Sequence, residues 1–182
     1  MSKVYAMIAD GTEEVECLAV VDLLRRARID TELVSVGKKN IVSSHKVAIT
    51  ADKTVGEVDL TSADLIFLPG GMPGSEHLAE CAPLISAIDK QLKSGKRVAA
   101  ICAAPAVVLG ANGLLRGKKA VCFPGFEDGC IGAEIMRGAR VVTDGNITTS
   151  RGMGCAVDLG LELIALLVGK DTAKKIKDAI QY

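Results

Sequence analysis

The sequence lacks the ligands from which most zinc sites are built. It has two histidines, and none of its six cysteines forms a Cys-X-X-Cys pair. Structural zinc sites usually place cysteine and histidine at such short spacings, so no metal site is expected. The glycines at 70–74 are not followed by Lys-Ser or Lys-Thr and lack the GxGxxG order, which argues against a bound nucleotide. We therefore expect the chain to work without a cofactor.

The sequence also has no excess of positive or negative charge and no long apolar run. The 22 Lys and Arg residues balance 22 Asp and Glu residues, with no basic stripe to favour nucleic acid or an anionic membrane. The apolar run at 159–168 is too short to span a membrane and contains Glu162. Ser2-Lys3 leads directly into the strand-like VYAMIAD at 4–10, so a signal peptide is not expected. These features predict a cytoplasmic protein with reduced thiols.

Strand-like and helix-like segments alternate along the 182 residues, with no linker, repeat or low-complexity tract between them. The predicted strands are 3–9, 31–36, 64–68, 97–101, 118–123, 140–142 and 147–149. The predicted helices are 15–28, 82–94, a segment after Cys102, 152–168 and 171–180, and small antiparallel strands are expected within 41–58. This alternation predicts an α/β fold with an open, doubly wound, mostly parallel sheet.

Three features fall at the carboxyl ends of predicted strands, where doubly wound sheets bind their ligands. The acidic segment DGTEEVE (10–16) follows the first strand, Pro69-Gly70-Gly71 follows the strand at 64–68, and Cys102 follows the strand at 97–101. We expect all three to meet in one crevice.

Cys102 lies where the buried strand 98–101 is expected to run into a helix. A sharp strand-to-helix turn would strain the backbone of Cys102 and point its thiol into the crevice. The N-terminus of the helix that follows would favour the thiolate over the thiol. Cysteine is also a common buried packing residue, so these residues alone leave both a nucleophile and a packing role open.

The acidic segment 13–16 opens a predicted helix, where carboxylates complement the helix dipole. Glu14 and Glu16 face different directions, so one of them can point toward the crevice and exchange a proton with Cys102. The pair Gly70-Gly71 lets the backbone approach a ligand closely, and its amides could bind an oxyanion. Turns also use Gly-Gly routinely, so the pair by itself is a weak signal.

Four stretches together resemble the ThiJ/PfpI superfamily, in the subgroup of Parkinson disease protein 7. They are DGTEEVE (10–16), LPGGMPG (68–74), AAICAAPAVV (99–108) and TSRGMG (149–154), in the expected order. The resemblance covers nearly the full length. It implies a flavodoxin-like sandwich, one domain over residues 1–182, and usually a homodimer.

By motif match, Cys102 is similar to the reactive nucleophile-elbow cysteine of this family, and Glu16 to the carboxyl group hydrogen-bonded to it. The resemblance also assigns the oxyanion-donor role to the amides of Gly71 and Ala103, and Gly70 of the Gly-Gly pair is a further oxyanion or substrate-binding candidate. Some members carry a histidine near the cysteine, where this chain has Phe123, and Ala103 rather than histidine follows Cys102. A Cys-His-acid triad within one subunit is therefore not expected, and Glu16 would handle protons alone.

The remaining candidates have simpler explanations. His77 is expected to be a solvated or capping residue, and Arg151 to fix a loop by pairing with backbone or a carboxylate. His45 lies in the small β segment, which the resemblance places close to the dimer partner's crevice, so it is a candidate for a role in trans. The other five cysteines are expected to be packing or surface thiols.

The resemblance leaves two functions open. As a lyase or hydrolase, the protein would convert methylglyoxal to lactate in a glyoxalase III-like reaction, or act as a deglycase on 2-oxoaldehyde adducts of thiols and amines. As a redox-sensing or chaperone-like protein, it would carry Cys102 as a sulfinate. Both fit protection against oxidative stress. A protease, described for distant members, is disfavoured because Ala103 replaces the histidine beside the cysteine.

Overall fold

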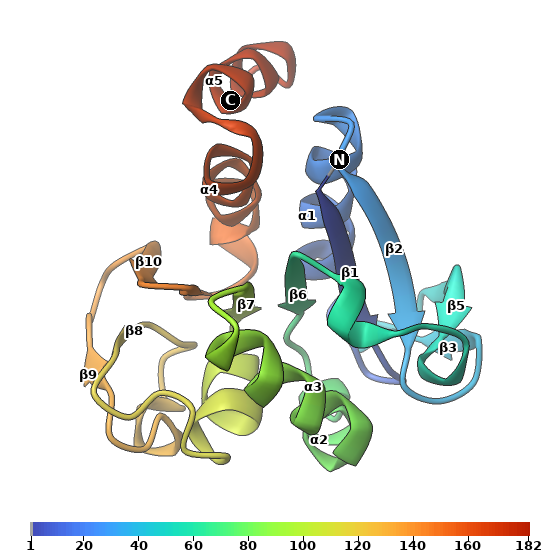
Figure 1. Ribbon diagram of the computed structural model, residues 1–182, viewed down its shortest axis with the longest axis vertical. Coiled ribbons are helices and arrows are strands. Elements are labelled where there is room, and N and C mark those ends of the chain that lie inside the picture. The colour runs from blue at the N-terminus through green and yellow to red at the C-terminus, as the bar shows by residue number, and fades with distance from the viewer. Residues whose placement is uncertain (1) are drawn as a thin grey trace.

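A seven-stranded sheet forms the centre of the protein (Figure 1), whose computed structural model describes residues 2–182. In sheet order its strands are β10 (Val141–Asp144), β11 (Ile147–Ser150), β7 (Arg97–Ile101), β6 (Leu65–Leu68), β1 (Lys3–Ile8), β2 (Asp30–Ser35) and β5 (Lys53–Thr54). All neighbours pair in parallel except β10, which runs antiparallel to β11. The α/β, flavodoxin-like fold predicted from the sequence is confirmed.

Helices cover both faces of the sheet, and each face has its own apolar core. The even-numbered residues of β1 pack on one face with α1 (Glu14–Arg26), α4 (Ala156–Val168) and α5 (Lys170–Ala179). The odd-numbered residues pack on the other face with α2 (Gly74–Glu80), α3 (Ala82–Lys93) and the π-helical turn η3 (Pro105–Gly110). Because strand side chains alternate between faces, a strand buried on both sides must be apolar along its buried part, as β1 is from Val4 and β7 from Val98.

The predicted strand at 118–123 is shorter in the structure. Only β8 (Lys119–Ala120) is a strand, and it pairs with β9 (Glu134–Ile135) in a separate two-stranded sheet. The backbone N–H of Val121 donates to the Thr149 hydroxyl at 3.0 Å instead of to a neighbouring strand. A side chain therefore takes the place of the backbone partner that a longer strand would need.

The segment 41–58 is only partly antiparallel. A hairpin of β3 (Asn40–Val42) and β4 (Ala48–Thr50) forms as expected, whereas β5 joins the main sheet in parallel with β2. Short 3-10 turns follow at η1 (Val55–Glu57) and η2 (Leu60–Ser62).

Three helical segments differ from the sequence prediction. The residues after Cys102 form a turn and then η3, in which the N–H of Ala111 donates to the carbonyl of Ala106 at 3.0 Å, a five-residue step that widens the helix. Helix α2 was not expected as a separate element, and α4 begins only after the 3-10 turn η5 (Met153–Cys155). A further 3-10 turn, η4, spans Glu127–Gly129. Across residues 2–182, no helix is both long enough and apolar enough to cross a membrane.

The strands that carry the three sequence features are neighbours in the sheet. The acidic segment follows β1, the Gly-Gly turn follows β6 and Cys102 follows β7, in the sheet order β7-β6-β1. Parallel strands end at the same edge, so all three features meet there, as expected from the sequence.

Candidate active site

Cys102 occupies a strained turn at the end of β7. Its φ of 64° lies in the left-handed region, which costs a non-glycine residue roughly 1–3 kcal/mol. Two backbone hydrogen bonds hold this conformation: the Cys102 N–H donates to the Ser150 carbonyl at 3.0 Å, and the Cys102 carbonyl accepts from the Phe123 N–H at 2.8 Å. The side chain is half-buried, so it borders both the protein interior and solvent. This is the sharp turn that the sequence predicts.

Glu16 points into the same crevice from the first turn of α1. Its side chain is buried, and its Oε2 accepts a hydrogen bond from the Gly70 N–H at 3.1 Å. Glu16 is also hydrogen-bonded to the Cys102 thiol and to the backbone of Met153. The carboxylate of Glu13 caps the helix by accepting from the Glu16 N–H at 2.6 Å, the helix-terminus role expected for it.

Gly70 makes the contact between carboxyl and thiol possible. A Cβ at this position would lie 2.5 Å from the Cβ of Cys102 and 2.9 Å from the carbonyl oxygen of Ile101, and would overlap with Glu16 as well. Any other residue at position 70 would separate the two functional groups. The amides of Gly71 and Ala103 complete the site, because both form hydrogen bonds to the Cys102 sulfur.

The electrostatics of the pair differ from the thiolate that the sequence suggests. Burial, with a contribution from the Glu13 carboxylate, raises the pKa of Glu16 to about 7. Burial and the neighbouring Glu16 carboxylate raise the pKa of Cys102 to about 12, although the amides of Gly71 and Ala103 act in the opposite direction. The expectation of a lowered thiol pKa is therefore wrong. Cys102 is followed by a turn and a π-helical segment instead of a regular helix N-terminus, and a carboxylate faces it.

The two groups titrate as one unit with a proton between them. Below about pH 7 the Glu16 carboxyl is protonated and can donate to the sulfur; above it, the carboxylate can accept the thiol proton. At neutral pH the resting form of Cys102 is therefore the thiol, not the thiolate.

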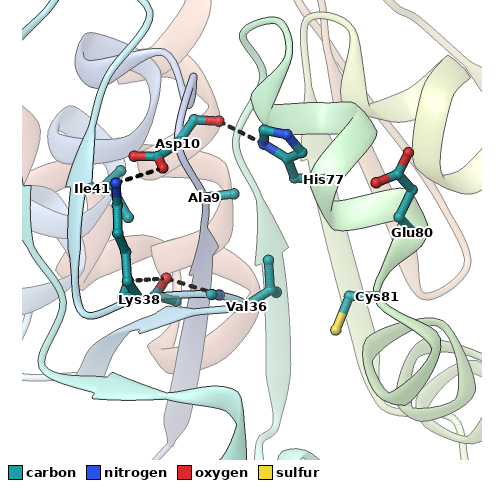
Figure 2. A pocket seen from close by; sticks show the side chains of 10 residues that line it. Ala9, Asp10, Val36, Lys38, Ile41, His77, Glu80 and Cys81 are labelled. Atoms are coloured by element: carbon teal, nitrogen blue, oxygen red, sulfur yellow. Dashed lines mark hydrogen bonds and ion pairs between the residues drawn. The ribbon is translucent and has the colours of Figure 1, made fainter.

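His77 has a structural role in a separate pocket of about 310 Å³. Its Nδ1 is hydrogen-bonded to the Asp10 carbonyl at 2.9 Å, and Lys38 forms an ion pair with the Asp10 carboxylate at 2.9 Å (Figure 2). Glu80 and Cys81 lie on the far side of the same pocket. His77 therefore ties α2 to the end of β1, in agreement with the non-catalytic role expected for it.

His45 lies on the hairpin between β3 and β4, next to the first turn of α1. Its ring is exposed, and its Nδ1 lies 3.2 Å from a carboxylate oxygen of Glu14 and 3.2 Å from the Ser44 hydroxyl. Glu13, Glu14 and His45 bring ligand atoms within 4.8 Å of one another, so these three could hold a metal ion. The sequence argument missed this group because His45 is distant from the two glutamates along the chain.

Arg151 does not pair as expected. It lines a second pocket, of about 370 Å³, beside Phe123 and Gly152. Among residues 2–182, neither a carboxylate nor a backbone carbonyl accepts a hydrogen bond from its guanidinium group, whereas the neighbouring Arg140 is bonded to Asp158 at 2.6 Å. The loop-fixing role belongs to Arg140 and was wrongly assigned to Arg151.

Most of the other cysteines are packing residues, as expected. Four are buried and Cys81 is half-buried; the buried ones are Cys17, Cys122, Cys130 and Cys155. The thiols of Cys122 and Cys130 are hydrogen-bonded to each other. Loop folding brings this pair together, and no sequence pattern indicated it.

The fold and the site define a flavodoxin-like α/β protein with a cysteine at a strand-to-helix elbow. The chain belongs to the DJ-1/PfpI family, whose model matches residues 2–166. It is 38% identical over 175 residues to protein DJ-1 homolog B of Arabidopsis thaliana, covering 96% of this chain and 40% of that protein. The chain thus spans less than half the length of that relative.

In two further comparisons, the match extends over most of both proteins. Deglycase PH1704 of Pyrococcus horikoshii is 33% identical over 151 residues, which are 82% of this chain and 89% of that protein. The structure of oxidized Toxoplasma gondii DJ-1 has a TM-score of 0.93 and 37% sequence identity, covering 100% of this chain and 99% of that one.

Replacing Glu16 with Gln tests the electrostatics of the pair. The variant Glu16→Gln removes the negative charge that raises the pKa of Cys102, so this pKa should fall by about one unit or more. Alkylation of Cys102 by iodoacetamide at about pH 8 should then be about tenfold faster. The measurement is the alkylation rate as a function of pH, followed by mass spectrometry of the Cys102 peptide.

Glu14→Gln is the matched control, because the Glu14 carboxylate faces Ser44 and His45. It should alkylate at the wild-type rate. An unchanged or higher Cys102 pKa in Glu16→Gln would contradict the charge coupling.

Proposed function

We propose that the protein is a cofactor-independent cysteine enzyme acting on 2-oxoaldehydes, by a glyoxalase III-like reaction, by deglycase action on their adducts, or by both. The observation that carries this proposal is a half-exposed thiol on a strained turn, hydrogen-bonded to the buried carboxyl of Glu16 and to two backbone amides. Thiol nucleophile, proton acceptor and oxyanion donors are the parts that such chemistry requires. The name of the deglycase relative from Pyrococcus supports the same class of reaction.

The first step is addition of the thiol to the aldehyde carbon. The Cys102 sulfur forms a bond to C1 of methylglyoxal while its proton moves to the Glu16 carboxylate. Since the pKa of Glu16 is about 7, the carboxyl can both accept and return a proton near neutral pH. The aldehyde oxygen takes the negative charge, which the amides of Gly71 and Ala103 can stabilise. Protonation of this oxygen gives a hemithioacetal.

The second step moves hydrogen between neighbouring carbons. Glu16 removes the proton from C1 of the hemithioacetal, giving an enediolate. The proton of the C1 hydroxyl moves to the C2 oxygen, and Glu16 returns its proton to C2. The product is a thioester of lactate with Cys102, and water hydrolyses it to lactate and the free thiol. Methylglyoxal plus one water gives lactic acid, so no oxidant or reductant is needed. For a hemithioacetal or hemiaminal adduct, loss of the carrier thiol or amine supplies the same aldehyde.

Removal of the nucleophile tests the proposal. In Cys102→Ala, formation of lactate from methylglyoxal should fall by about a hundredfold or more, because the covalent route is lost. The measurement is enzymatic determination of lactate with purified protein. Cys81→Ala is the control, since Cys81 is a half-buried cysteine in the separate His77 pocket. Equal lactate formation by wild type and Cys102→Ala would end the proposal.

Redox sensing through Cys102 is a second candidate function. The same amides and the Glu16 carboxyl can hold the oxygens of a sulfinate, and the half-exposed sulfur is open to peroxide. The four buried thiols are shielded from peroxide. We also propose a cytoplasmic location, which free cysteines suit. The solved relative from Toxoplasma is described as oxidized, which favours examining this chemistry.

Mild peroxide treatment tests this second function. Two oxygen atoms should be added to Cys102 alone, because it combines partial exposure with hydrogen-bond donors for a sulfinate. Intact-mass analysis followed by peptide mapping measures the addition. Glu16→Ala, which lacks the carboxyl proton, should stop less cleanly at the sulfinate. Oxidation spread over several cysteines, or a disulfide at Cys102, would count against this function.

We also propose that the chain forms a homodimer, with His45 reaching the crevice of the second subunit. Apolar side chains are exposed around the start of α1 and on the adjacent hairpin, and such a surface supports association. These residues are Val15, Leu18, Val42 and Val47, each between 38% and 46% exposed.

The dimer proposal is tested by placing a charge in this surface. Leu18→Glu should shift sedimentation velocity from dimer toward monomer, because a carboxylate in an apolar contact is costly. His45→Ala should leave the dimer intact and lower activity only if His45 acts in trans. A wild-type chain that sediments as a monomer at micromolar concentration would contradict both parts.

A further inference from the structure

We propose that Arg151 forms an anion-binding subsite beside Cys102, so that the protein prefers substrates carrying a carboxylate or phosphate group. The identity of these substrates as 2-oxoaldehydes rests on the proposed function above. Binding of the anionic group is independent of the proposed function, because it follows from the position and charge of Arg151.

Arg151 and Cys102 leave the sheet side by side. Strands β11 and β7 pair in parallel, with Ser150 opposite Ile101, and each is the last residue of its strand. Arg151 and Cys102 are the next residues, and adjacent strands lie about 4.8 Å apart. The hydrogen bond from the Cys102 N–H to the Ser150 carbonyl confirms this closeness. The backbone of Arg151 therefore lies beside the reactive turn.

The pocket that Arg151 lines adjoins the candidate active site. Phe123, in the wall of this pocket, donates its N–H to the Cys102 carbonyl. Gly152, also in the wall, is so near to Glu16 that a Cβ at this position would lie 3.9 Å from its Oε1 and 3.2 Å from Cδ2 of Phe123. Gly152 is therefore a neighbour of both the pocket wall and Glu16.

Two arginines line this pocket, and one of them lacks an acidic partner among residues 2–182. Arg140 is neutralised by Asp158 at 2.6 Å and donates to the Gly154 carbonyl at 2.6 Å. Arg151 is half-buried and has no such acceptor among residues 2–182. A guanidinium has five donors in a planar fork that matches a carboxylate or phosphate. An anion in the pocket would supply the missing acceptors.

The arrangement also orients a substrate. An ionised Glu16 repels anions, so the uncharged aldehyde end belongs at Cys102 and the anionic end at Arg151. Exposed apolar side chains of Phe123 and Met153 line the space between, where a carbon chain would lie. The substrate class is thus a 2-oxoaldehyde, or its adduct, with a carboxylate or phosphate a few atoms from the reactive carbon.

Alkylation by two reagents of equal size tests the subsite without any assumption about turnover. Iodoacetate and iodoacetamide both alkylate a thiolate, and they differ in one negative charge. The measured quantity is the ratio of their rates at Cys102, divided by the same ratio for N-acetylcysteine. We expect this normalised ratio to fall about tenfold or more in Arg151→Gln, because a charge-assisted bidentate contact is lost.

Two matched variants serve as controls. Arg151→Lys keeps the charge without the fork, and should retain part of the preference and show that the position tolerates substitution. Arg26→Gln removes one positive charge at the last turn of α1, where Arg26 pairs with Asp22, and should leave the ratio unchanged. Circular dichroism checks that each variant is folded.

Three outcomes decide the proposal. Equal normalised ratios in wild type and Arg151→Gln would overturn it. A weaker dimer in Arg151→Gln with an unchanged ratio would also overturn it, since Arg151 would then meet a second copy. A ratio that depends on Arg151 in a protein inactive on methylglyoxal would support the subsite while the proposed function fails.

A kinetic comparison extends the test to phosphate. Hydroxypyruvaldehyde phosphate and hydroxypyruvaldehyde differ only in the phosphate group. The wild-type kcat/KM should favour the phosphate by about tenfold, and Arg151→Gln should lose this preference. A preference for iodoacetate without one for the phosphate would assign the subsite to carboxylates.

Discussion

The hydrogen bond between the Cys102 thiol and the Glu16 carboxyl is the interaction on which the site depends. Each group alone would be an ordinary residue: a half-buried cysteine in a turn and a buried glutamate in a first helical turn. Burial raises the pKa of both groups, and the Glu16 carboxylate raises that of Cys102 further, whereas the hydrogen bond with Cys102 lowers that of Glu16. In the function that we propose, this pair supplies the nucleophile and the base.

Two unfavourable terms accompany the contact between Cys102 and Glu16. Cys102 adopts a left-handed backbone conformation, and Glu16 gives up water. The backbone of Cys102 is held in place by the paired strands β7 and β11 and by the N–H of Phe123. The N–H of Gly70 partly compensates Glu16 for the lost water. Position 70 must remain without a side chain, because the space between the two groups is filled. The strain is local and the apolar cores on both sheet faces sustain it.

Much of the fold and part of the site could be predicted from the sequence. Strands buried on both faces give continuous apolar runs, so β1, β6 and β7 were evident, and parallel strands ending at one edge bring DGTEEVE, Gly-Gly and Cys102 together. The short β8 and the π-helical η3 were not evident, because a Thr149 hydroxyl and close packing against the segment at Gly129–Cys130 decide them. The family resemblance added the pairing of Glu16, rather than Glu14, with Cys102.

The sequence by itself determined the order of strands and helices, the apolar faces and the residue types at the sheet edge, since these follow from local periodicity. Only the tertiary structure decided the charges of the site. The pKa of Cys102 depends on how deeply it is buried and on which carboxylate faces it. Which arginine of the second pocket pairs with Asp158 is likewise decided by the tertiary structure, and it is Arg140. Electrostatic energies depend on distances and solvent exposure between residues far apart in the chain, and local sequence contains neither.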